Sequence, residues 1–246
     1  MLLRVENLEK WFGKVHALRG INFSLDSGEI VGLVGDNGAG KSTFANILSG
    51  VYLPTHGSIY WKGEEVHIRS VQEARKLGIE TVYQEHSVIG NLDVAQNIFL
   101  GREEVRTFGP IKIINREQMT KKAELLTKKL GLSISSPKQE VRFCSGGEKQ
   151  GIAMSRTMYF NADLVILDEP TRALSVSATK EVLSFVRQLA EGDQACIFIT
   201  HNLHHVHPVA DRFVIMSHGK IRANVKKEET SIEQLEELLL RPASSI

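Results

Sequence analysis

The chain has 246 residues and a formal net charge of +1, with 42% hydrophobic and 24% charged residues. This composition is ordinary for a folded globular protein, and the near-neutral net charge gives no field that would attract a polyanion, so we expect no nucleic-acid partner. The length suits one elaborated domain or two small ones, and we expect a single domain, residues 1–246, with an insertion. No apolar run reaches the roughly 18 to 20 residues that cross a bilayer, and the first residues do not resemble a signal peptide. We therefore expect a cytoplasmic protein in which Cys144 and Cys196 remain thiols.

Short segments of alternating polar and apolar residues occupy the first quarter of the chain. They predict hairpin strands at residues 2–5, 21–25, 58–61 and 64–68. Within the same quarter, an apolar run at residues 30–34 leads into a helix-like segment at residues 43–49.

The middle third changes character, because apolar residues recur there at helical intervals. It predicts a helical insertion, approximately residues 88–160, with helices at residues 94–100, 116–130 and 148–159. Beyond it, strands and helices alternate, which favours a parallel sheet with helices on its faces. We expect strands at residues 164–167, 195–200 and 213–216, a helix at 178–189, and an amphipathic C-terminal helix near 231–241 that Ser231 caps.

A Gly-x4-Gly-Lys-Ser loop lies between the apolar run and the following helix. In such a loop the glycines let successive N–H groups point at an anion, and the helix adds its positive N-terminal end. The lysine supplies a cation for the terminal phosphates, and the serine offers a hydroxyl to Mg²⁺. An accidental match in a chain of this length is expected about once in a hundred. We predict that a nucleotide is bound by Gly35, Asp36, Asn37, Gly38, Ala39, Gly40, Lys41, Ser42 and Thr43.

Two carboxylates, Asp168 and Glu169, follow the apolar run at residues 164–167. They fall where a buried strand leaves the sheet, which is the edge at which parallel sheets bind ligands. Alone, an acidic turn after a core strand is an equally good interpretation. Beside a phosphate loop, however, a magnesium-dependent hydrolase requires such an acidic strand end.

A second loop precedes a helical run, with Ser145, Gly146 and Gly147 at its centre. Serine followed by two glycines exposes backbone N–H groups at a helix start, so this loop predicts a second anion site of the same physical kind.

These motifs, in this order, resemble the ATP-binding subunits of ABC transporters over nearly the whole chain. Residues 35–42 resemble the Walker A loop, 144–148 the signature, and 164–169 Walker B with its catalytic glutamate. The resemblance implies a P-loop NTPase fold, with a RecA-like parallel core sheet in a three-layer α/β/α arrangement, an N-terminal antiparallel β subdomain and a helical insertion. It also implies that Gln84 is the Q-loop glutamine, that His201 is the switch histidine and that Phe12 stacks on adenine. Residues 83–87 and 91–103 resemble importers of monosaccharides such as ribose, xylose and galactose.

The resemblance also implies a mechanism and partners. Two copies would join head to tail, and Ser145, Gly146 and Gly147 of one would close on ATP held by the other. Ser42, Gln84 and Asp168 would hold Mg²⁺, Lys41 would neutralise phosphate charge, Glu169 would activate water, and His201 would contact the γ-phosphate. An integral membrane permease, and indirectly a sugar-binding protein, would complete the transporter at the cytoplasmic face of the cell membrane. Glu85 is a candidate permease contact, or equally part of a solvated loop.

Four positions depart from the family pattern. Cys144 and Glu148 replace the usual leucine and glutamine of the signature, although the residues that would touch phosphate are intact. Gly151 stands where a basic residue is frequent, and a glycine within a helix costs roughly 1 kcal/mol relative to alanine. Ser175 replaces an aspartate, which affects the expected communication between paired sites.

Other interpretations remain open. A soluble ABC-type ATPase could act as a clamp in repair, translation or regulation, but such proteins join two cassettes or carry coiled coils. A P-loop kinase or GTPase would leave the Ser-Gly-Gly loop unexplained.

The histidines at 201, 204, 205 and 207 have the spacing of zinc ligands on a helix, but no cysteine or carboxylate completes the set. Trp11 and Trp61 are expected to be packing residues.

Overall fold

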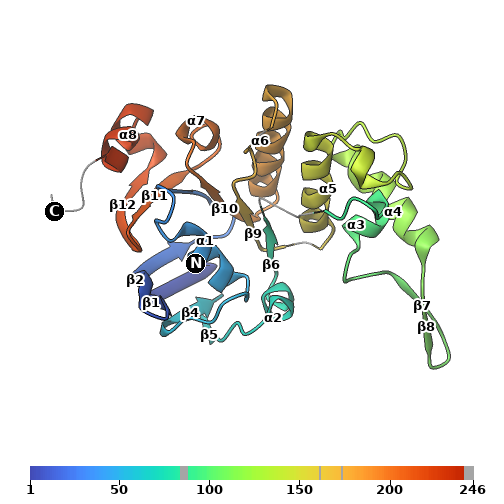
Figure 1. Ribbon diagram of the computed structural model, residues 1–246, viewed down its shortest axis with the longest axis horizontal. Coiled ribbons are helices and arrows are strands. Elements are labelled where there is room, and N and C mark those ends of the chain that lie inside the picture. Colours follow the sequence, from blue (N-terminus) through green and yellow to red (C-terminus); the bar gives the residue numbers. More distant parts are fainter. Residues whose placement is uncertain (84–87, 161, 173, 241–246) are drawn as a thin grey trace. The chain divides into compact units, whose positions relative to one another are not determined.

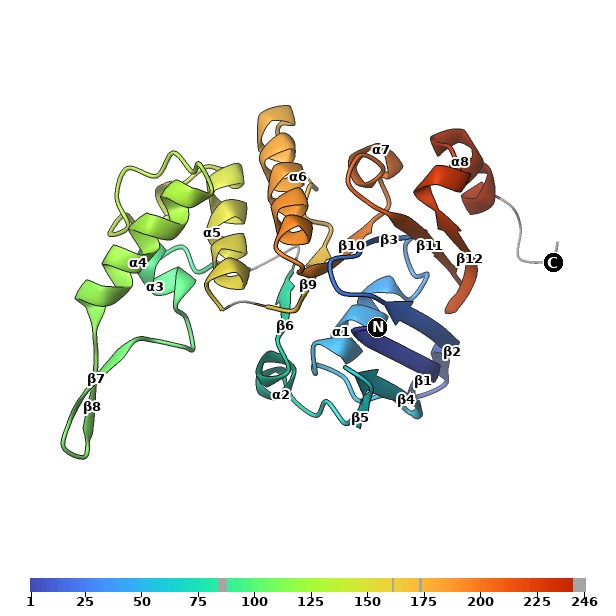
Figure 2. The same cartoon turned by 180° about the vertical axis from the view of Figure 1, so that it is seen from behind.

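The computed structural model describes residues 1–83, 88–160, 162–172 and 174–240. The chain forms two compact units. The core unit comprises Met1–Thr81, Ala162–Pro170 and Leu183–Ile246, and the helical unit comprises Val82–Asn161 and Thr171–Val182. Figures 1 and 2 show the elements of both units from opposite sides.

An antiparallel sheet of four strands forms the first part of the core unit, in the order β2-β1-β4-β5. Its strands are β1 (Leu3–Phe12), β2 (Val15–Leu25), β4 (His56–Trp61) and β5 (Glu64–Val66). Residue Val5 of β1 lies opposite Phe23 of β2 and Ile59 of β4, so apolar side chains share one face of the sheet. The hairpin strands predicted from alternation are present, and the first two are longer than the pattern indicated.

A second sheet of six strands has the order β12-β11-β3-β10-β9-β6. Its members are β3 (Ile30–Val34), β6 (Ile79–Val82), β9 (Leu164–Asp168), β10 (Ala195–Thr200), β11 (Arg212–Ser217) and β12 (Lys220–Lys226). Strand β10 pairs in parallel with both β3 and β9, so Thr200 lies beside Val34 and Ile199 beside Asp168. The segments that follow β3, β9 and β10 therefore leave the sheet at one edge.

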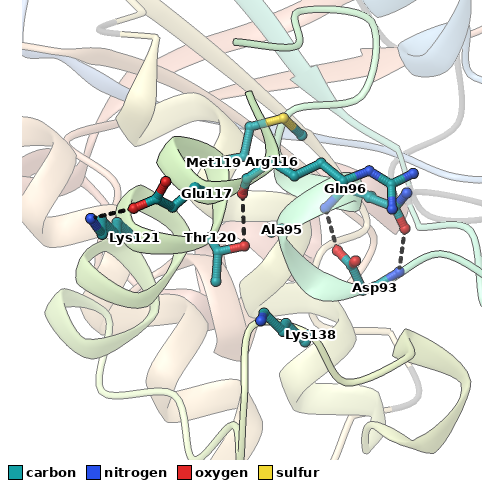
Figure 3. A pocket seen from close by; sticks show the side chains of 9 residues that line it. All are labelled: Asp93, Ala95, Gln96, Arg116, Glu117, Met119, Thr120, Lys121 and Lys138. Atoms are coloured by element: carbon teal, nitrogen blue, oxygen red, sulfur yellow. Dashed lines mark hydrogen bonds and ion pairs between the residues drawn. The ribbon is translucent and has the colours of Figure 1, made fainter. Parts of the chain in front are cut away.

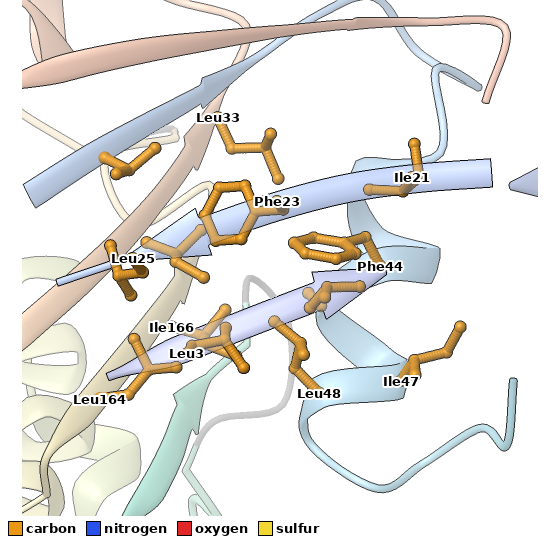
Figure 4. Close-up of a cluster of buried hydrophobic side chains, with 14 of the residues drawn as sticks. Leu3, Ile21, Phe23, Leu25, Leu33, Phe44, Ile47, Leu48, Leu164 and Ile166 are labelled. Carbon is orange, nitrogen blue, oxygen red and sulfur yellow. The ribbon is translucent and has the colours of Figure 1, made fainter. Parts of the chain in front are cut away.

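The core unit is stabilised by an apolar core that includes side chains of both sheets and of α1 (Lys41–Leu48). Figure 4 shows Phe44 of α1 beside Phe23 of β2, with 5.3 Å between ring centroids. Phe44 is 1% exposed, and burying such a side chain stabilises the fold by about 1.5–3 kcal/mol. The other helices in this unit are α2 (Val71–Lys76), α7 (Leu203–Val206) and α8 (Ile232–Leu240), while α6 (Val176–Glu191) begins in the helical unit and ends in the core unit.

The helical unit has its own apolar core, formed chiefly by α3 (Val94–Ile98), α4 (Arg116–Lys129) and α5 (Gly146–Tyr159). Phe99 and Tyr159 pack edge to face there, with ring centroids 4.7 Å apart. Helix α3 begins with a capping box between Asp93 and Gln96, so its short length is offset by two hydrogen bonds at its start.

The three helices predicted in the insertion are present, but the insertion also contains a strand hairpin, which was not predicted, at residues 105–114. Strands β7 (Val105–Phe108) and β8 (Ile111–Ile114) form an antiparallel hairpin there. Valine, isoleucine and phenylalanine favour strands, and Gly109-Pro110 forms the turn, so local preference outweighs the helical pattern of the surrounding segment. In the described part of the chain, no helix combines the length and apolar character needed to cross a bilayer.

Candidate functional site

The phosphate loop connects β3 to α1. Gly40 precedes the helix with a left-handed backbone, φ 103°, and within the described residues no side chain of the loop caps α1. The first turn of α1 carries no acidic residue either. The N–H groups at this helix start are therefore available to an external acceptor, and the helix dipole favours an anion, so the loop fits a phosphate group.

Two glycines of this loop are required by close packing. A Cβ atom on Gly40 would lie 2.9 Å from the side chain of Leu18 and 3.0 Å from the carbonyl oxygen of Ala17. A Cβ atom on Gly35 would overlap the carbonyl oxygen of Met216. Any other residue would displace the loop from β2 and β11, so these glycines maintain the shape of the phosphate site.

Lys41 is 7% exposed and lies at the first position of α1. Its Nζ donates hydrogen bonds to the carbonyl oxygens of Gly35 at 2.6 Å and of Asp36 at 3.0 Å. Burial lowers the pKa of Lys41, and the carboxylates of Glu169, Asp168 and Asp36 oppose this shift. The ammonium thus lies inside the loop, where phosphate oxygens could replace the carbonyl oxygens as its acceptors.

Ser42, in the first turn of α1, lies near Asp168, the last residue of β9, and its hydroxyl interacts with the Asp168 carboxylate. Burial raises the pKa of Asp168. The Ser42 hydroxyl and the Lys41 ammonium oppose this rise, and the Glu169 carboxylate adds to it. A hydroxyl and a carboxylate oxygen are ligands that Mg²⁺ prefers, and a bound cation would offset the desolvation of the carboxylate. The pair therefore fits a magnesium ion.

Glu169 follows β9 with a left-handed backbone, φ 49°. For a residue with a side chain this conformation costs roughly 1–3 kcal/mol and persists only where surrounding contacts maintain it. The Glu169 N–H donates to the carbonyl oxygen of Ile199 at 2.9 Å. Its carboxylate accepts from the Thr200 hydroxyl at 3.2 Å and from the His201 N–H at 3.1 Å. The end of β10 therefore holds this carboxylate in position.

His201 contacts Glu169 directly, with 2.7 Å between Nδ1 and Oε1. The expected contact of His201 with a γ-phosphate stays a prediction. The neighbouring histidines do not gather into a metal site: over the residues that the structure describes, no group of three or more His, Cys, Asp or Glu side chains could hold a metal ion. His207 instead stacks on Phe213, with ring centroids 5.5 Å apart.

Phe12 ends β1 and is 40% exposed, with its ring edge-on against Tyr52 at 5.1 Å between centroids. An exposed ring is compatible with stacking on adenine, which stays a prediction. Trp61 is buried in the core as expected, whereas Trp11 is half exposed and stacks on His16.

In the helical unit, Ser145 begins α5 through a capping box. Its Oγ accepts from the Glu148 N–H at 3.3 Å, and Glu148 Oε2 accepts from the Ser145 N–H at 2.7 Å. A glutamine could make the same two bonds, so the replacement preserves the helix start. Glu148 nevertheless adds a negative charge at a helix end where an anion is expected, and the motif alone did not indicate this effect.

The glycines of α5 differ in their surroundings. A Cβ atom on Gly147 would lie 2.8 Å from the Cβ of Ala178, whereas one on Gly146 would meet nothing closer than 3.8 Å. A Cβ atom on Gly151 would overlap the side chain of Leu132. Gly151, which the sequence suggested would only weaken α5, therefore leaves room for the side chain of Leu132 to pack against that helix.

Ser175 stands where the family has an aspartate, and its Oγ accepts from the Ala178 N–H at 3.3 Å, at the start of α6. The Ser145 and Ser175 positions line one cavity of about 530 Å³ in the helical unit. Glu148 and Glu181 also line it. The two helix starts favour an anion in this cavity, while the two carboxylates oppose it.

Two predicted residues, Gln84 and Glu85, lie outside the described residues, so their roles stay predictions. Conversely, Thr200 was not singled out from the sequence, although its hydroxyl bonds to Glu169. The available signal was a hydroxyl residue at the end of the apolar run 195–200, directly before His201.

Known proteins share the sequence pattern and the fold of this chain. The ABC transporter family matches residues 18–172. The chain is 39% identical over 238 residues to the xylose/arabinose import ATP-binding protein XylG of Sulfolobus acidocaldarius, covering 97% of this chain and 93% of that protein. It is 32% identical to the ribose import ATP-binding protein RbsA of Caldanaerobacter subterraneus over 97% of this chain, but it spans only 47% of that protein.

A solved ATP-binding cassette has the same fold, with a TM-score of 0.77 and 22% identity over 92% of this chain and 99% of that one. That structure is a dimer in a post-hydrolysis state, bound to ADP and phosphate. The predicted fold class is therefore confirmed. Since the family match and the 39% identity to XylG cover most of the sequence, the chain belongs to the ABC transporter family of ATP-binding proteins.

Proposed function

We propose that this protein is an ATP-hydrolysing subunit that drives sugar import through a separate membrane permease. The observation that carries the proposal is the meeting of Lys41, Ser42, Asp168 and Glu169 at one edge of the parallel sheet. The choice of sugar import is supported by relatives that import xylose, arabinose and ribose.

Nucleotide binding would use the helix start and the buried lysine. The N–H groups at the start of α1 would bind phosphate oxygens, and Lys41 would exchange the carbonyl oxygens of Gly35 and Asp36 for more negative phosphate oxygens. Ser42 and Asp168, together with Gln84, would hold Mg²⁺, which neutralises phosphate charge when bound.

Hydrolysis would depend on Glu169. Its carboxylate, held by Thr200 and His201, would orient and deprotonate the attacking water at about 2.6–3.2 Å. The Nδ1 contact with Glu169 holds the His201 ring at this strand end, from which it would respond to the γ-phosphate. Preorganised charge of this kind lowers the barrier because it needs no reorganisation during the reaction.

The complete site would need a second copy of the chain. Ser145, Gly146 and Gly147 form a separate helix start, and in a head-to-tail pair those of one copy would close on the γ-phosphate bound by the other. A solved cassette of the same fold that is dimeric and bound to ADP and phosphate supports a pair of chains. The remaining proposed partners are the permease and, indirectly, a sugar-binding protein, at the cytoplasmic face of the cell membrane.

Lys41→Ala tests the phosphate site. We expect ATP affinity to fall at least about tenfold, because a buried charge-assisted contact is removed. Lys62→Ala, which removes a half-exposed ammonium from the same unit, serves as the matched control and should bind ATP like the parent. Unchanged ATP affinity of Lys41→Ala would contradict the proposed phosphate site.

Reconstitution of the protein with the permease and labelled sugars tests transport. If ATP hydrolysis were stimulated only by nucleic acid or ribosomes, the soluble clamp would be favoured instead.

A further inference from the structure

A two-stranded ribbon projects from the helical unit and carries exposed apolar side chains. It consists of β7, β8 and their turn, residues 105–114, and all eight strand residues are exposed. Among its large apolar residues, the two beside the turn are exposed most, with 65% for Phe108 and 61% for Ile111. Figures 1 and 2 both show the ribbon extending away from α3, α4 and α5. The exposure of so many large apolar side chains on one small element indicates a contact surface.

Both faces of this ribbon are apolar. The alternation of side chains along the register puts Phe108, Ile111 and Ile113 on one face and Val105 and Ile114 on the other. A flat protein surface would cover one face and leave the other in water. A medium that surrounds the tip covers both, and the boundary between lipid headgroups and acyl chains is such a medium.

The ribbon is also cationic. Residues 105–114 contain Arg106 and Lys112 and no acidic residue. A guanidinium nitrogen of Arg106 lies 3.5 Å from the Glu117 carboxylate, but both side chains are more than half exposed, so this pair is weak and can open. Apolar residues at the tip with cations behind them complement a bilayer that has anionic headgroups.

The positive charge continues to the root of the ribbon, where a cavity of about 540 Å³ lies between the starts of α3 and α4 (Figure 3). Three cations, Arg116, Lys121 and Lys138, and two carboxylates, Asp93 and Glu117, line it, which leaves a net charge of +1 (3 − 2). Dashed lines in Figure 3 join Glu117 to Lys121, whereas the side chains of Arg116 and Lys138 are not joined to any residue drawn.

We propose that residues 105–114 insert their tip into the interface of an anionic lipid bilayer, with Arg106, Lys112 and Arg116 contacting lipid phosphates. The inference deepens the proposed function, on which it rests in one respect: a transport ATPase works beside a membrane. The protein then has a membrane contact of its own, separate from its contact with a permease.

Flotation of the full chain with vesicles, in the absence of any permease, tests the proposal. One set of vesicles contains phosphatidylcholine alone, and the other contains equal parts of phosphatidylcholine and phosphatidylglycerol. We expect at least about tenfold tighter binding to the anionic set, weakened by salt. The double variant Phe108→Ser/Ile111→Ser should lose at least about tenfold in vesicle affinity, and Lys112→Ser should lose a few-fold on anionic vesicles only.

Leu125→Ser is the matched control, because it removes a side chain that is 70% exposed from α4 of the same unit. It should bind vesicles like the parent. Circular dichroism and ATP hydrolysis in solution should be unchanged in every ribbon variant, since the ribbon supplies no residue to the nucleotide site. As a direct readout of insertion, brominated lipids should quench the added fluorescence of Phe108→Trp but not that of Leu125→Trp.

Three results would overturn the proposal: equal vesicle binding by the parent and by Phe108→Ser/Ile111→Ser, no preference for phosphatidylglycerol, or loss of permease binding in detergent by the double variant with vesicle binding unchanged. The last result would assign the ribbon to a protein partner.

Failure of the proposed bilayer contact is distinguishable from failure of the proposed function. Intact ATP hydrolysis without vesicle binding contradicts the bilayer contact alone, whereas absent ATP hydrolysis in the parent contradicts the proposed function.

Discussion

Asp168 and Glu169 are neighbours in sequence, but their surroundings differ. Asp168 ends β9, where burial raises its pKa and the nearby Ser42 hydroxyl opposes that rise. Glu169 has a left-handed backbone and is bonded by two groups at the end of β10, Thr200 and His201. One strand end thus presents a carboxylate suited to a metal ion and another suited to a water molecule.

Asp168→Asn should stabilise the folded chain while abolishing magnesium-dependent hydrolysis. Because burial raises the pKa of Asp168, the folded state favours the protonated form. The carboxylate therefore destabilises the fold increasingly as pH rises from its ordinary pKa through the raised one. Thermal unfolding should show a midpoint about 2–4 °C higher for the variant at neutral pH, corresponding to about 1 kcal/mol. The difference in midpoint should become smaller as the pH of the measurement is lowered toward the ordinary pKa of aspartate, because the parent's carboxyl group is then protonated as well. A variant that unfolds at or below the parent's midpoint would contradict the argument.

At the scale of elements, the helix starts of the helical unit combine packing with exposed N–H groups. Gly147 lies where the first turns of α5 and α6 approach each other. A Cβ atom on Gly147 would be only 2.8 Å from the Cβ atom of Ala178. Gly146 has room for a side chain. The sequence indicates only that two glycines expose the backbone, so the packing requirement separates two positions that look equivalent.

Substituting alanine at each glycine tests this difference. Gly147→Ala should destabilise the helical unit by about 1–3 kcal/mol, since the added methyl group must displace α6. Gly146→Ala should be neutral or slightly stabilising, because alanine is the better helix former. Urea unfolding and hydrogen exchange of α5 measure both effects. Equal changes in the two variants would show that the approach of the helices does not limit this position.

At the scale of the molecule, the groups proposed to act on ATP belong to different units. Lys41 and Glu169 lie in the core unit, and Ser145 lies in the helical unit. The two units have separate apolar cores, one of them shown in Figure 4. A head-to-tail pair would bring the core unit of one copy to the helical unit of the other, so ATP would act as part of the interface.

Glu169→Gln should uncouple dimer formation from turnover. The amide cannot accept a proton from water, so kcat should fall about 10²- to 10⁴-fold while ATP binding is retained. Light scattering should then report a dimer that persists with ATP and Mg²⁺ and dissociates when the magnesium is chelated. Hydrolysis at the parent's rate would remove Glu169 from its role, and a monomer at saturating ATP would contradict the shared site.

The sequence by itself determined the family, the parallel sheet, and the phosphate loop with its lysine and serine, because these features depend on contiguous residues and local periodicity. It left the hairpin at residues 105–114 unpredicted, because the helical periodicity of the surrounding insertion outweighed the local strand signal of its β-branched residues and its Gly109-Pro110 turn. Only the tertiary structure decided that β10 supplies Thr200 to Glu169 and that Gly151 admits Leu132. The physical reason is the same in each case: these contacts join residues 19 to 31 positions apart, and close packing between elements leaves no signal in either segment alone.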